Sequence, residues 1–369
     1  MSYRPFAGTP PEPARPPTWV LACGALFCSS LGAVTAIAYA DTLEFGNAPR
    51  TPMGAGSSAA PAATARPVAA SPICPREMVL LAGGQFSMGT DSRHPALNLA
   101  RPAHPVSVDS FCIGTHEVTA QEYEACTEQG QCTPAHHAAH FVSEEPGGES
   151  DDSEMVHAQQ CNASKVERER HPINCISHDQ AASYCAAVGG RLPSEAEWEF
   201  AARGPRSQAY PWGEAKPTAE HVNACGKECA RWHSDVGLAA EVHGLMYEED
   251  DGYSGTAPVG SFPLGASRDG VVDMIGNVFE WTRDGIYIYG RDASVNPAGP
   301  GASESFVIRG GNFNSAIAEF SDPALRFSMN ADSYSHGVGF RCASEPRHEA
   351  VQRAAVEAAP GPSSNGSDD

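Results

Sequence analysis

Glycine and proline interrupt this sequence throughout, and they limit how long any helix or strand can be. The 369 residues include 36 glycines and 30 prolines. Glycine favours turns, and proline ends helices and interrupts the hydrogen bonding of central strands. Between residues 74 and 344 the apolar segments are short and of mixed helical and strand type. This pattern predicts one α+β domain with much irregular structure.

Both ends of the chain lack the composition of a folded core. Residues 41–73 consist largely of Ala, Pro, Ser, Thr and Gly, which predicts a flexible linker. Residues 345–369 are polar and rich in alanine, which predicts a disordered tail. The folded part is therefore predicted to be residues 74–344, and its length fits a single domain.

An uncharged, mostly apolar stretch at residues 19–40 predicts export. Two arginines precede it and two acidic residues follow it closely, which keeps residues 1–18 in the cytoplasm. Its length fits either a cleaved signal peptide or a transmembrane anchor that attaches the chain to the membrane. We therefore expect the domain in the cell envelope, on the periplasmic side, either membrane-anchored or secreted.

The net charge of −21 excludes one class of partner. Such a surface repels the phosphate backbone, so we expect no nucleic-acid binding. The acidic residues are concentrated in runs at 144–154 and 248–251. We interpret the first run as a solvated loop.

The cysteines predict disulfides. Of twelve cysteines, two lie in the apolar stretch, which leaves an even number, ten, for an oxidising compartment. Sequence alone does not fix their connectivity. Zinc binding by Cys225 and Cys229 is the weaker alternative, because no second Cys or His pair stands at ligand spacing. The close pairs that could form local bridges are Cys126 with Cys132, Cys161 with Cys175, and Cys225 with Cys229.

Three helices are predicted from capping boxes, in which a hydroxyl residue is followed three positions later by Glu or Gln. Residues 78–81 and 85–88, separated by two glycines, predict an opening hairpin. Further strands are predicted at 106–108, 306–309 and 338–342. The capping boxes are Thr119 with Glu122, Ser177 with Gln180, and Ser194 with Glu197.

Several collinear segments carry a resemblance to a known family. The most specific is RLPSEAEWEFAARG at 191–204, followed by YPWG at 210–213. The others are GGQFSMG at 83–89, HPVSVDSFCIGTHEVT at 104–119, HPINCISHDQAASYC at 171–185, GTAPVGSFP at 255–263, VVDMIGNVFEW at 271–281, IRGGNF at 308–313 and GVGFRCA at 337–343. The chain thus resembles the formylglycine-generating enzyme, or sulfatase-modifying factor, family. The resemblance implies that family's fold, which is akin to the C-type-lectin superfold.

The resemblance also implies two calcium sites. Calcium prefers several oxygen ligands in flexible geometry, and a glycine-bearing turn between two acids can supply them. Without the resemblance, we would interpret the two acids of the second site as surface charges. The implied first site comprises Asn223, the backbone of Ala224, Asp251 and the backbone of Tyr253. The implied second site comprises Asp273, the carbonyls of Gly276 and Val278, and Glu280.

Further implied features are a disulfide and a ligand groove. Cys185 and Cys342 match two positions that form a disulfide in the family. The groove would form around Trp281, Arg309, Asn312, Phe313 and Arg326.

One part of the family pattern is missing. The family's catalyst is a pair of cysteines just before the arginine that here is Arg326, and the two thiolates hold copper(I). The corresponding residues 314–325 read NSAIAEFSDPAL and contain no cysteine. Asn330 stands where relatives often carry an arginine of the substrate groove. We therefore expect no copper, and we assign no catalytic residue.

Two functional hypotheses follow. The first is an exported, calcium-stabilised module that binds a protein, peptide or small-molecule ligand in the envelope without copper-thiolate chemistry. The alternative is an oxidative enzyme of the family that uses oxygen and a non-standard site on a peptide cysteine or a small molecule. His136, His137 and His140 could bind a metal if they were helical, but the neighbouring composition favours a solvated loop.

Overall fold

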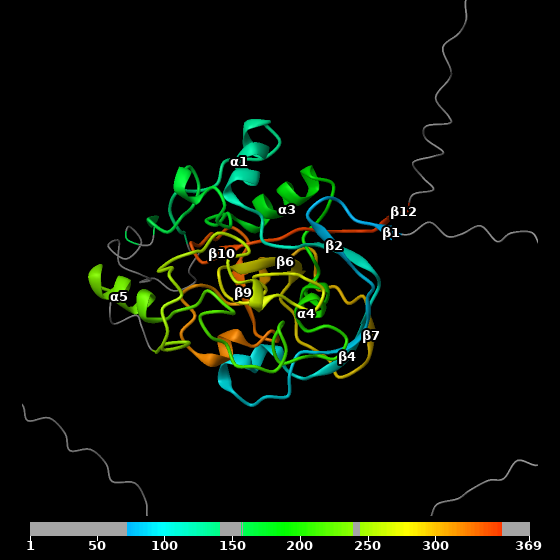
Figure 1. Cartoon of the computed structure of the whole chain (residues 1–369). Helices are drawn as coiled ribbons and strands as arrows, with labels where there is room; N and C mark the ends of the chain where they lie inside the picture. The colour runs from blue at the N-terminus through cyan, green and yellow to red at the C-terminus, as the bar shows by residue number, and fades with distance from the viewer. Residues whose placement is uncertain (1–71, 141–155, 157, 239–243, 349–369) are drawn as a thin grey trace, which may run out of the picture. The chain divides into compact units, whose positions relative to one another are not determined.

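The computed structural model describes residues 72–140, 156, 158–238 and 244–348 (Figure 1). The predicted cytoplasmic segment, the apolar stretch at 19–40, the acidic run at 144–154 and the tail beyond residue 348 lie outside these residues. Within the described part, none of the helices has both the length and the apolar character needed to cross a membrane.

The described chain forms short helices and strands joined by long irregular connections, as the glycine and proline content predicts. The helices are α1 (Ala120–Glu128), α3 (His178–Ala187), α4 (Glu195–Arg203) and α5 (Lys227–Asp235). Short 3-10 turns are η1 (Pro95–Ala100), η2 (Val166–Arg168), η4 (Pro263–Gly265) and η5 (Ala318–Ser321). The strands are β1 (Pro72–Ile73), β2 (Met78–Leu81), β3 (Gly84–Met88), β4 (His104–Val108), β5 (Phe111–Gly114), β6 (Phe279–Gly285), β7 (Ser294–Val295), β8 (Ser305–Arg309), β9 (Arg326–Asn330), β10 (Val338–Gly339), β11 (Ala343–Ser344) and β12 (Arg347–His348).

The three predicted capping boxes are confirmed. In each case the hydroxyl side chain accepts from the backbone N–H three residues on, and the Glu or Gln there accepts from the cap's own N–H. These contacts satisfy backbone donors that the first helical turn would otherwise leave unpaired. Helix α5 was not predicted, because its N-cap is Gly226 and no side chain caps it.

The strands form small sheets around a four-stranded sheet in the order β10-β6-β8-β9. Strand β6 crosses the middle of the view in Figure 1, and both α3 and α4 pack against it. One hydrophobic cluster surrounds Trp281 and Phe340, and a second surrounds Trp198 and Phe200. The central sheet therefore lies at the junction of two cores.

The predicted opening hairpin is wrong. β2 pairs with β5, whereas β3 pairs with β4, so the two strands belong to different sheets. Gly83 and Gly84 both have positive φ, at 72° and 137°, and they redirect the chain between the sheets. A Cβ at Gly83 would lie 2.4 Å from the carbonyl oxygen of Val108, so this turn requires glycine.

The folded region extends beyond the predicted limits of 74 and 344. Residues 72–73 form β1 and residues 347–348 form β12, and the two strands pair in an antiparallel sheet. The segments predicted as linker and tail therefore contribute one strand each. This pairing brings the two ends of the described domain side by side (Figure 1).

Five disulfides cross-link the described residues. The local bridges predicted from close spacing are present, as is the long-range Cys185–Cys342 bond between α3 and the segment before β11. The fifth bond joins Cys74 to Cys112 and attaches the start of the domain to β5. Sequence spacing could not identify that pair, because 38 residues separate the two cysteines.

Candidate functional site

Residues 314–325, which contain no cysteine, begin beside the Cys225–Cys229 disulfide. Asn314 Oδ1 lies 4.0 Å from Cys229 Sγ, and Asn314 Nδ2 lies 3.4 Å from His336 Nε2. The N–H of Cys225 donates to the Ser315 carbonyl at 3.0 Å. The Asn314 amide thus lies beside the His336 imidazole and the oxidised pair Cys225–Cys229.

None of the ten cysteines outside the apolar stretch is a free thiol. All ten belong to the described residues, and each is disulfide-bonded. A thiolate is the form of cysteine that binds soft metals such as copper(I). The described cysteines therefore offer no thiolate pair in this state.

The predicted ligand groove is wrong in its lining. Trp281 and Arg309 are 0% exposed, and Phe313 and Arg326 are 1% exposed. Asn312, the fifth predicted residue, is partly buried and donates from Nδ2 to the Gly337 carbonyl at 3.5 Å. Four of the five residues therefore belong to the interior and cannot line an open groove.

The two groove arginines are held by acidic residues of α4. Arg309 donates to Glu195 at 3.0 Å and to Glu199 at 2.6 Å. Arg326 donates to Glu195 at 2.7 Å, and Arg203 donates to Glu199 at 2.7 Å. Buried charges persist when they are paired and hydrogen-bonded in this way. The arginines act as internal counter-ions for α4.

The second predicted calcium site lies in the turn that leads into β6. Asp273 and Gly276 adopt positive φ angles of 55° and 82°, and Val278 is buried just before the strand. Asp273 and Glu280 are also buried, so they are not surface charges. Burial, and to a smaller extent the nearby charge of Glu280, raises the pKa of Asp273.

The two carboxylates already have protein partners. Glu280 accepts from Arg341 Nε and Nη2, both at 2.7 Å, and from Trp198 Nε1 at 2.8 Å. Asp273 accepts from the N–H of Gly260 at 2.6 Å. Arg341 is thus the cation that neutralises Glu280.

A third carboxyl group, which the sequence analysis missed, completes this cluster. Glu117 is fully buried, and its Oε1 accepts from Asn277 Nδ2 at 3.0 Å. Its Oε2 has no hydrogen-bond partner among the described atoms. Burial, followed by the charge of Asp273, raises the pKa of Glu117 well above its ordinary value. Three buried acids around Arg341 can together carry more negative charge than one guanidinium neutralises, and a calcium ion could offset that excess only with backbone carbonyls among its ligands.

The first predicted calcium site is arranged differently. Asn223 is buried, and its Nδ2 donates to the Gly255 carbonyl at 3.0 Å. Asp251 Oδ1 accepts from the N–H of Tyr253 at 2.8 Å. A Tyr247 hydroxyl lies between Asp251 Oδ2 and the Ala224 carbonyl, at 2.5 and 3.0 Å. Burial raises the pKa of Asp251 to about 6. With a hydroxyl between two of its ligands, this site does not fit calcium.

Metal sites built only from side chains are not found in the described part. No three His, Cys, Asp or Glu residues there form a group that could hold a metal ion. A calcium ion at the second site would therefore need backbone carbonyl ligands as well as carboxylates. The histidine cluster is non-helical, as expected: His136 stacks on Tyr334 with ring centroids 3.7 Å apart, and His140 exchanges backbone hydrogen bonds with the same tyrosine.

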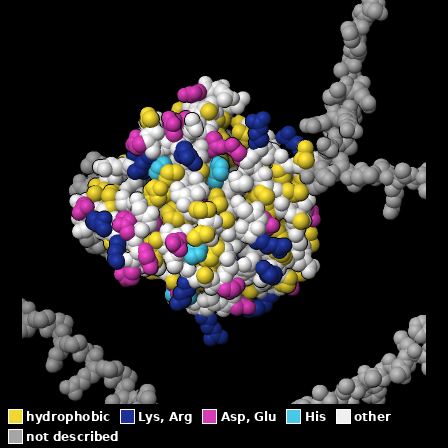
Figure 2. Space-filling model, in the orientation of Figure 1, with side chains coloured by type: hydrophobic (Ala, Val, Ile, Leu, Met, Phe, Trp, Pro, Cys, Tyr) yellow, Lys and Arg dark blue, Asp and Glu magenta, His cyan; other side chains and the backbone are white. Residues whose placement is uncertain are grey.

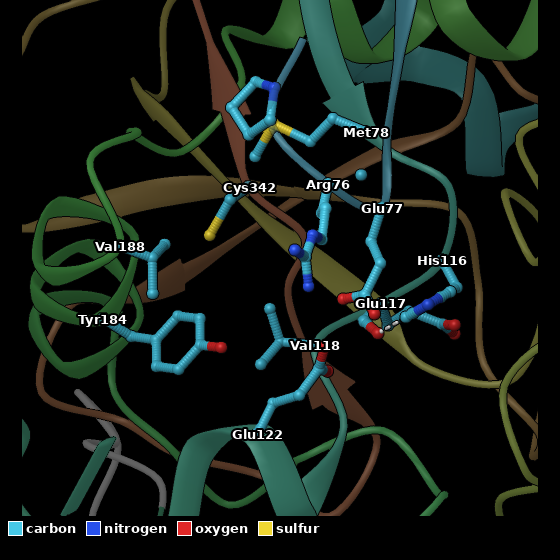
Figure 3. A pocket seen from close by; sticks show the side chains of 12 residues that line it. Arg76, Glu77, Met78, His116, Glu117, Val118, Glu122, Tyr184, Val188 and Cys342 are labelled. Carbon is cyan, nitrogen blue, oxygen red and sulfur yellow. Dashed lines mark hydrogen bonds between the residues drawn. The ribbon is translucent and has the colours of Figure 1, made fainter. Parts of the chain in front are cut away.

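A pocket of about 290 Å³ opens beside β2 and α3 (Figure 3). Val118, Tyr184 and Val188 form an apolar side, and the carboxyl groups of Glu77 and Glu122 lie across from them. The hydrogen bond to Glu122, followed by the charge of that glutamate, raises the pKa of Glu77. The pocket can bury apolar surface, and its polar edge carries Arg76 and His116 as well as the two carboxyl groups. None of the predicted groove residues lines it.

Comparison with known proteins identifies the family. Residues 64–346 match the sulfatase-modifying factor enzyme 1-like domain. The chain is 29% identical to the formylglycine-generating enzyme of Bos taurus over 80% of this chain and 84% of that protein. It is 30% identical to the inactive C-alpha-formylglycine-generating enzyme 2 of Mus musculus, over 72% of this chain and 85% of that protein.

A solved structure agrees with the sequence matches. PvdO from Pseudomonas aeruginosa superposes with a TM-score of 0.52 at 26% identity, over 73% of this chain and 94% of that one. The chain therefore belongs to the formylglycine-generating enzyme family. The predicted fold class, a mixed helix and strand domain with this family's C-type-lectin-like fold, is confirmed.

Proposed function

We propose that this protein is an exported, calcium-stabilised binding module of the formylglycine-generating enzyme family that performs no copper-thiolate chemistry. One observation carries the proposal: residues 314–325 contain no cysteine, and all ten described cysteines are disulfide-bonded. A copper(I) site of the family type needs two thiolates. The family also includes the mouse member whose name states that it is inactive.

Export is supported by two features of the sequence and structure. The uncharged stretch at 19–40 has the flanking charges of an export signal. Five disulfides in one domain are typical of proteins that leave the cytoplasm, because reducing conditions there keep thiols free.

Calcium is proposed at the second site, where it would stabilise the turn before β6. Glu117, Asp273 and Glu280 supply three buried carboxyl groups, and Arg341 offsets one of their charges. The carbonyls of Gly276 and Val278 are the backbone ligands that the resemblance implies. A bound dication would remove the remaining repulsion, and it would hold Asp273 in its left-handed conformation.

The test of this site is calcium removal. EGTA should lower the melting temperature, because an ion that binds only the folded state stabilises it by about 2.7 kcal/mol when free calcium is about 100-fold above Kd. Asp273→Asn should abolish the difference, since Asn tolerates positive φ but lacks the charge. Asp269→Asn, on the exposed surface nearby, is the control. An equal melt with and without EGTA in the unsubstituted protein contradicts the proposal.

The proposed ligand site is the pocket in Figure 3, because its apolar side can bury apolar surface and its carboxyl groups, which outnumber the Arg76 guanidinium, can pair with a ligand cation. Benzylamine is a suitable probe, and benzyl alcohol is its neutral counterpart. Val188→Trp should fill the pocket and weaken benzylamine binding at least tenfold by NMR titration. Val166→Trp, at a position that is 80% exposed and outside the pocket, should have no effect. Equal binding by both variants would exclude this pocket.

The alternative, an oxidative enzyme with a non-standard site, is favoured by the formylglycine-generating enzymes among the relatives. Plasma mass spectrometry of protein dialysed against metal-free buffer separates the two proposals. Calcium without a transition metal supports the binding module. Copper or iron near one per chain, together with oxygen consumption on a thiol peptide, would support the enzyme.

A further inference from the structure

The Tyr247 hydroxyl is surrounded by oxygen atoms in an unusual way for a buried tyrosine. The residue is 7% exposed, and its ring belongs to the same hydrophobic cluster as Val222 and Ala224. The hydroxyl oxygen lies 2.5 Å from Asp251 Oδ2, 2.9 Å from the Val222 carbonyl and 3.0 Å from the Ala224 carbonyl. It also accepts from the N–H of Ala224 at 3.0 Å.

One carboxylate oxygen and two carbonyl oxygens surround the Tyr247 hydroxyl, as oxygen ligands would surround a cation. A tyrosine has one proton to donate, and the shortest contact assigns that proton to Asp251. The two carbonyl oxygens then face the hydroxyl oxygen without a proton of their own. A calcium ion takes about 6 to 8 oxygen ligands at about 2.3 to 2.6 Å, and three converging oxygen acceptors could supply part of such a shell.

The hydroxyl and a calcium ion cannot occupy this space together. An ion bound to both Asp251 Oδ2 and the Ala224 carbonyl would stand between those two atoms, where the Tyr247 oxygen now lies. Asp251 is also satisfied without a metal. Its Oδ1 accepts from the N–H of Tyr253 at 2.8 Å, and its Oδ2 accepts from the N–H of Ala224 at 3.3 Å.

Two further contacts fasten the same region without a metal. Glu228 accepts from the N–H of Asp251 at 3.3 Å and from the N–H of Gly226 at 3.0 Å. The Cys225–Cys229 disulfide closes the start of the connection between Asn223 and Asp251. The segment is thus cross-linked by hydrogen bonds and one covalent bond.

We propose that the Tyr247 hydroxyl takes the place of the calcium ion at the first site implied by the family resemblance. The hydrogen bond that Tyr247 donates to Asp251 and the one that it accepts from the Ala224 N–H replace the cation that would join Ala224 to Asp251. The chain therefore binds one calcium ion fewer than the resemblance implies. This inference is independent of whether the second site, around Asp273, binds calcium.

The experiment counts bound calcium by equilibrium dialysis of the full chain, four single variants and the double variant Tyr247→Phe/Asp251→Asn. Tyr247→Phe keeps the ring in the core and removes the hydroxyl, and Asp251→Asn removes the charge of the first site. Asp273→Asn reports on the second site. Tyr123→Phe is the matched control, because Tyr123 is also a buried tyrosine that donates to a backbone carbonyl, that of Thr133.

The unsubstituted protein should bind one calcium ion, which Asp273→Asn loses and Asp251→Asn retains. Tyr247→Phe should bind one ion more than the unsubstituted protein, and the double variant Tyr247→Phe/Asp251→Asn should lose that additional ion. Tyr123→Phe should bind the same number of ions as the unsubstituted protein. If Asp251→Asn alone loses an ion, or if folded Tyr247→Phe gains none, the proposal is wrong. If Tyr247→Phe does not fold, the Asp251→Asn count still decides. A count of zero that rises to one in Tyr247→Phe would support this proposal while contradicting calcium at the second site.

Discussion

At the scale of single residues, the interior of this domain is built around arginines. Arg309, Arg326 and Arg341 are among the largest fully buried side chains, and each is bonded to a buried glutamate. Aromatic rings add to this environment: the Arg326 guanidinium lies 4.1 Å from the Tyr289 ring centroid. The three arginines therefore have a structural role. Replacing one of them should leave its glutamate partners charged and buried.

Arg309→Met tests that interpretation. The change leaves Glu195 and Glu199 without this partner, so it should lower the free energy of unfolding by about 3 to 5 kcal/mol in urea titrations. Arg291→Met is the control, because that arginine is exposed and its ion pair with Asp91 is long, at 4.0 Å. The free energy of unfolding should fall by less than about 1 kcal/mol in this variant. A small loss at Arg309 would mean that water reaches the network.

The roles of such residues could not be predicted from the sequence. The resemblance places Arg309 and Arg326 beside a groove, but their burial depends on Glu195 and Glu199, more than 100 residues away. Glu117 is similar, because its unpartnered oxygen is visible only when the chain folds it towards Asp273 and Glu280. Local signals, in contrast, were sufficient to predict the roles of the helix-capping residues.

At the scale of elements, local chemistry was predictable and pairing was not. The capping boxes located α1, α3 and α4 because each contact spans three residues. The β2 and β3 strands were located correctly but paired incorrectly, since their partners β5 and β4 are set by the tertiary fold. Helix α5 lacks a side-chain cap and follows no local rule that would reveal it.

The Cys185–Cys342 bond should contribute more to stability than the local bridges. It closes a separation of 157 residues, and the chain-entropy model gives about 5 kcal/mol for a loop of that size. Cys126–Cys132 spans 6 residues, for which the same model gives about 2 kcal/mol. Replacing each pair by alanine and comparing urea unfolding should show the larger loss for the Cys185 and Cys342 pair. Equal losses would show that loop closure does not dominate.

At the scale of the whole molecule, the chain has the family's fold. Acidic and basic side chains are interspersed on the face shown in Figure 2, without a continuous basic strip there. The resemblance predicted the fold correctly, because the shared motifs lie in strands, helix starts and turns that build both hydrophobic clusters. It predicted the groove poorly, because four of the five groove residues are buried and the pocket in Figure 3 is lined by other residues.

The pairing of β1 with β12 has a consequence for engineering. Adjacent strands lie about 5 Å apart, so residues 72 and 348 could be joined by a short peptide without distorting the domain. New ends could then be opened at an exposed turn far from this edge, giving a circular permutant with the same sheets. The same closeness would let the domain be inserted into a surface loop of another protein as a single unit.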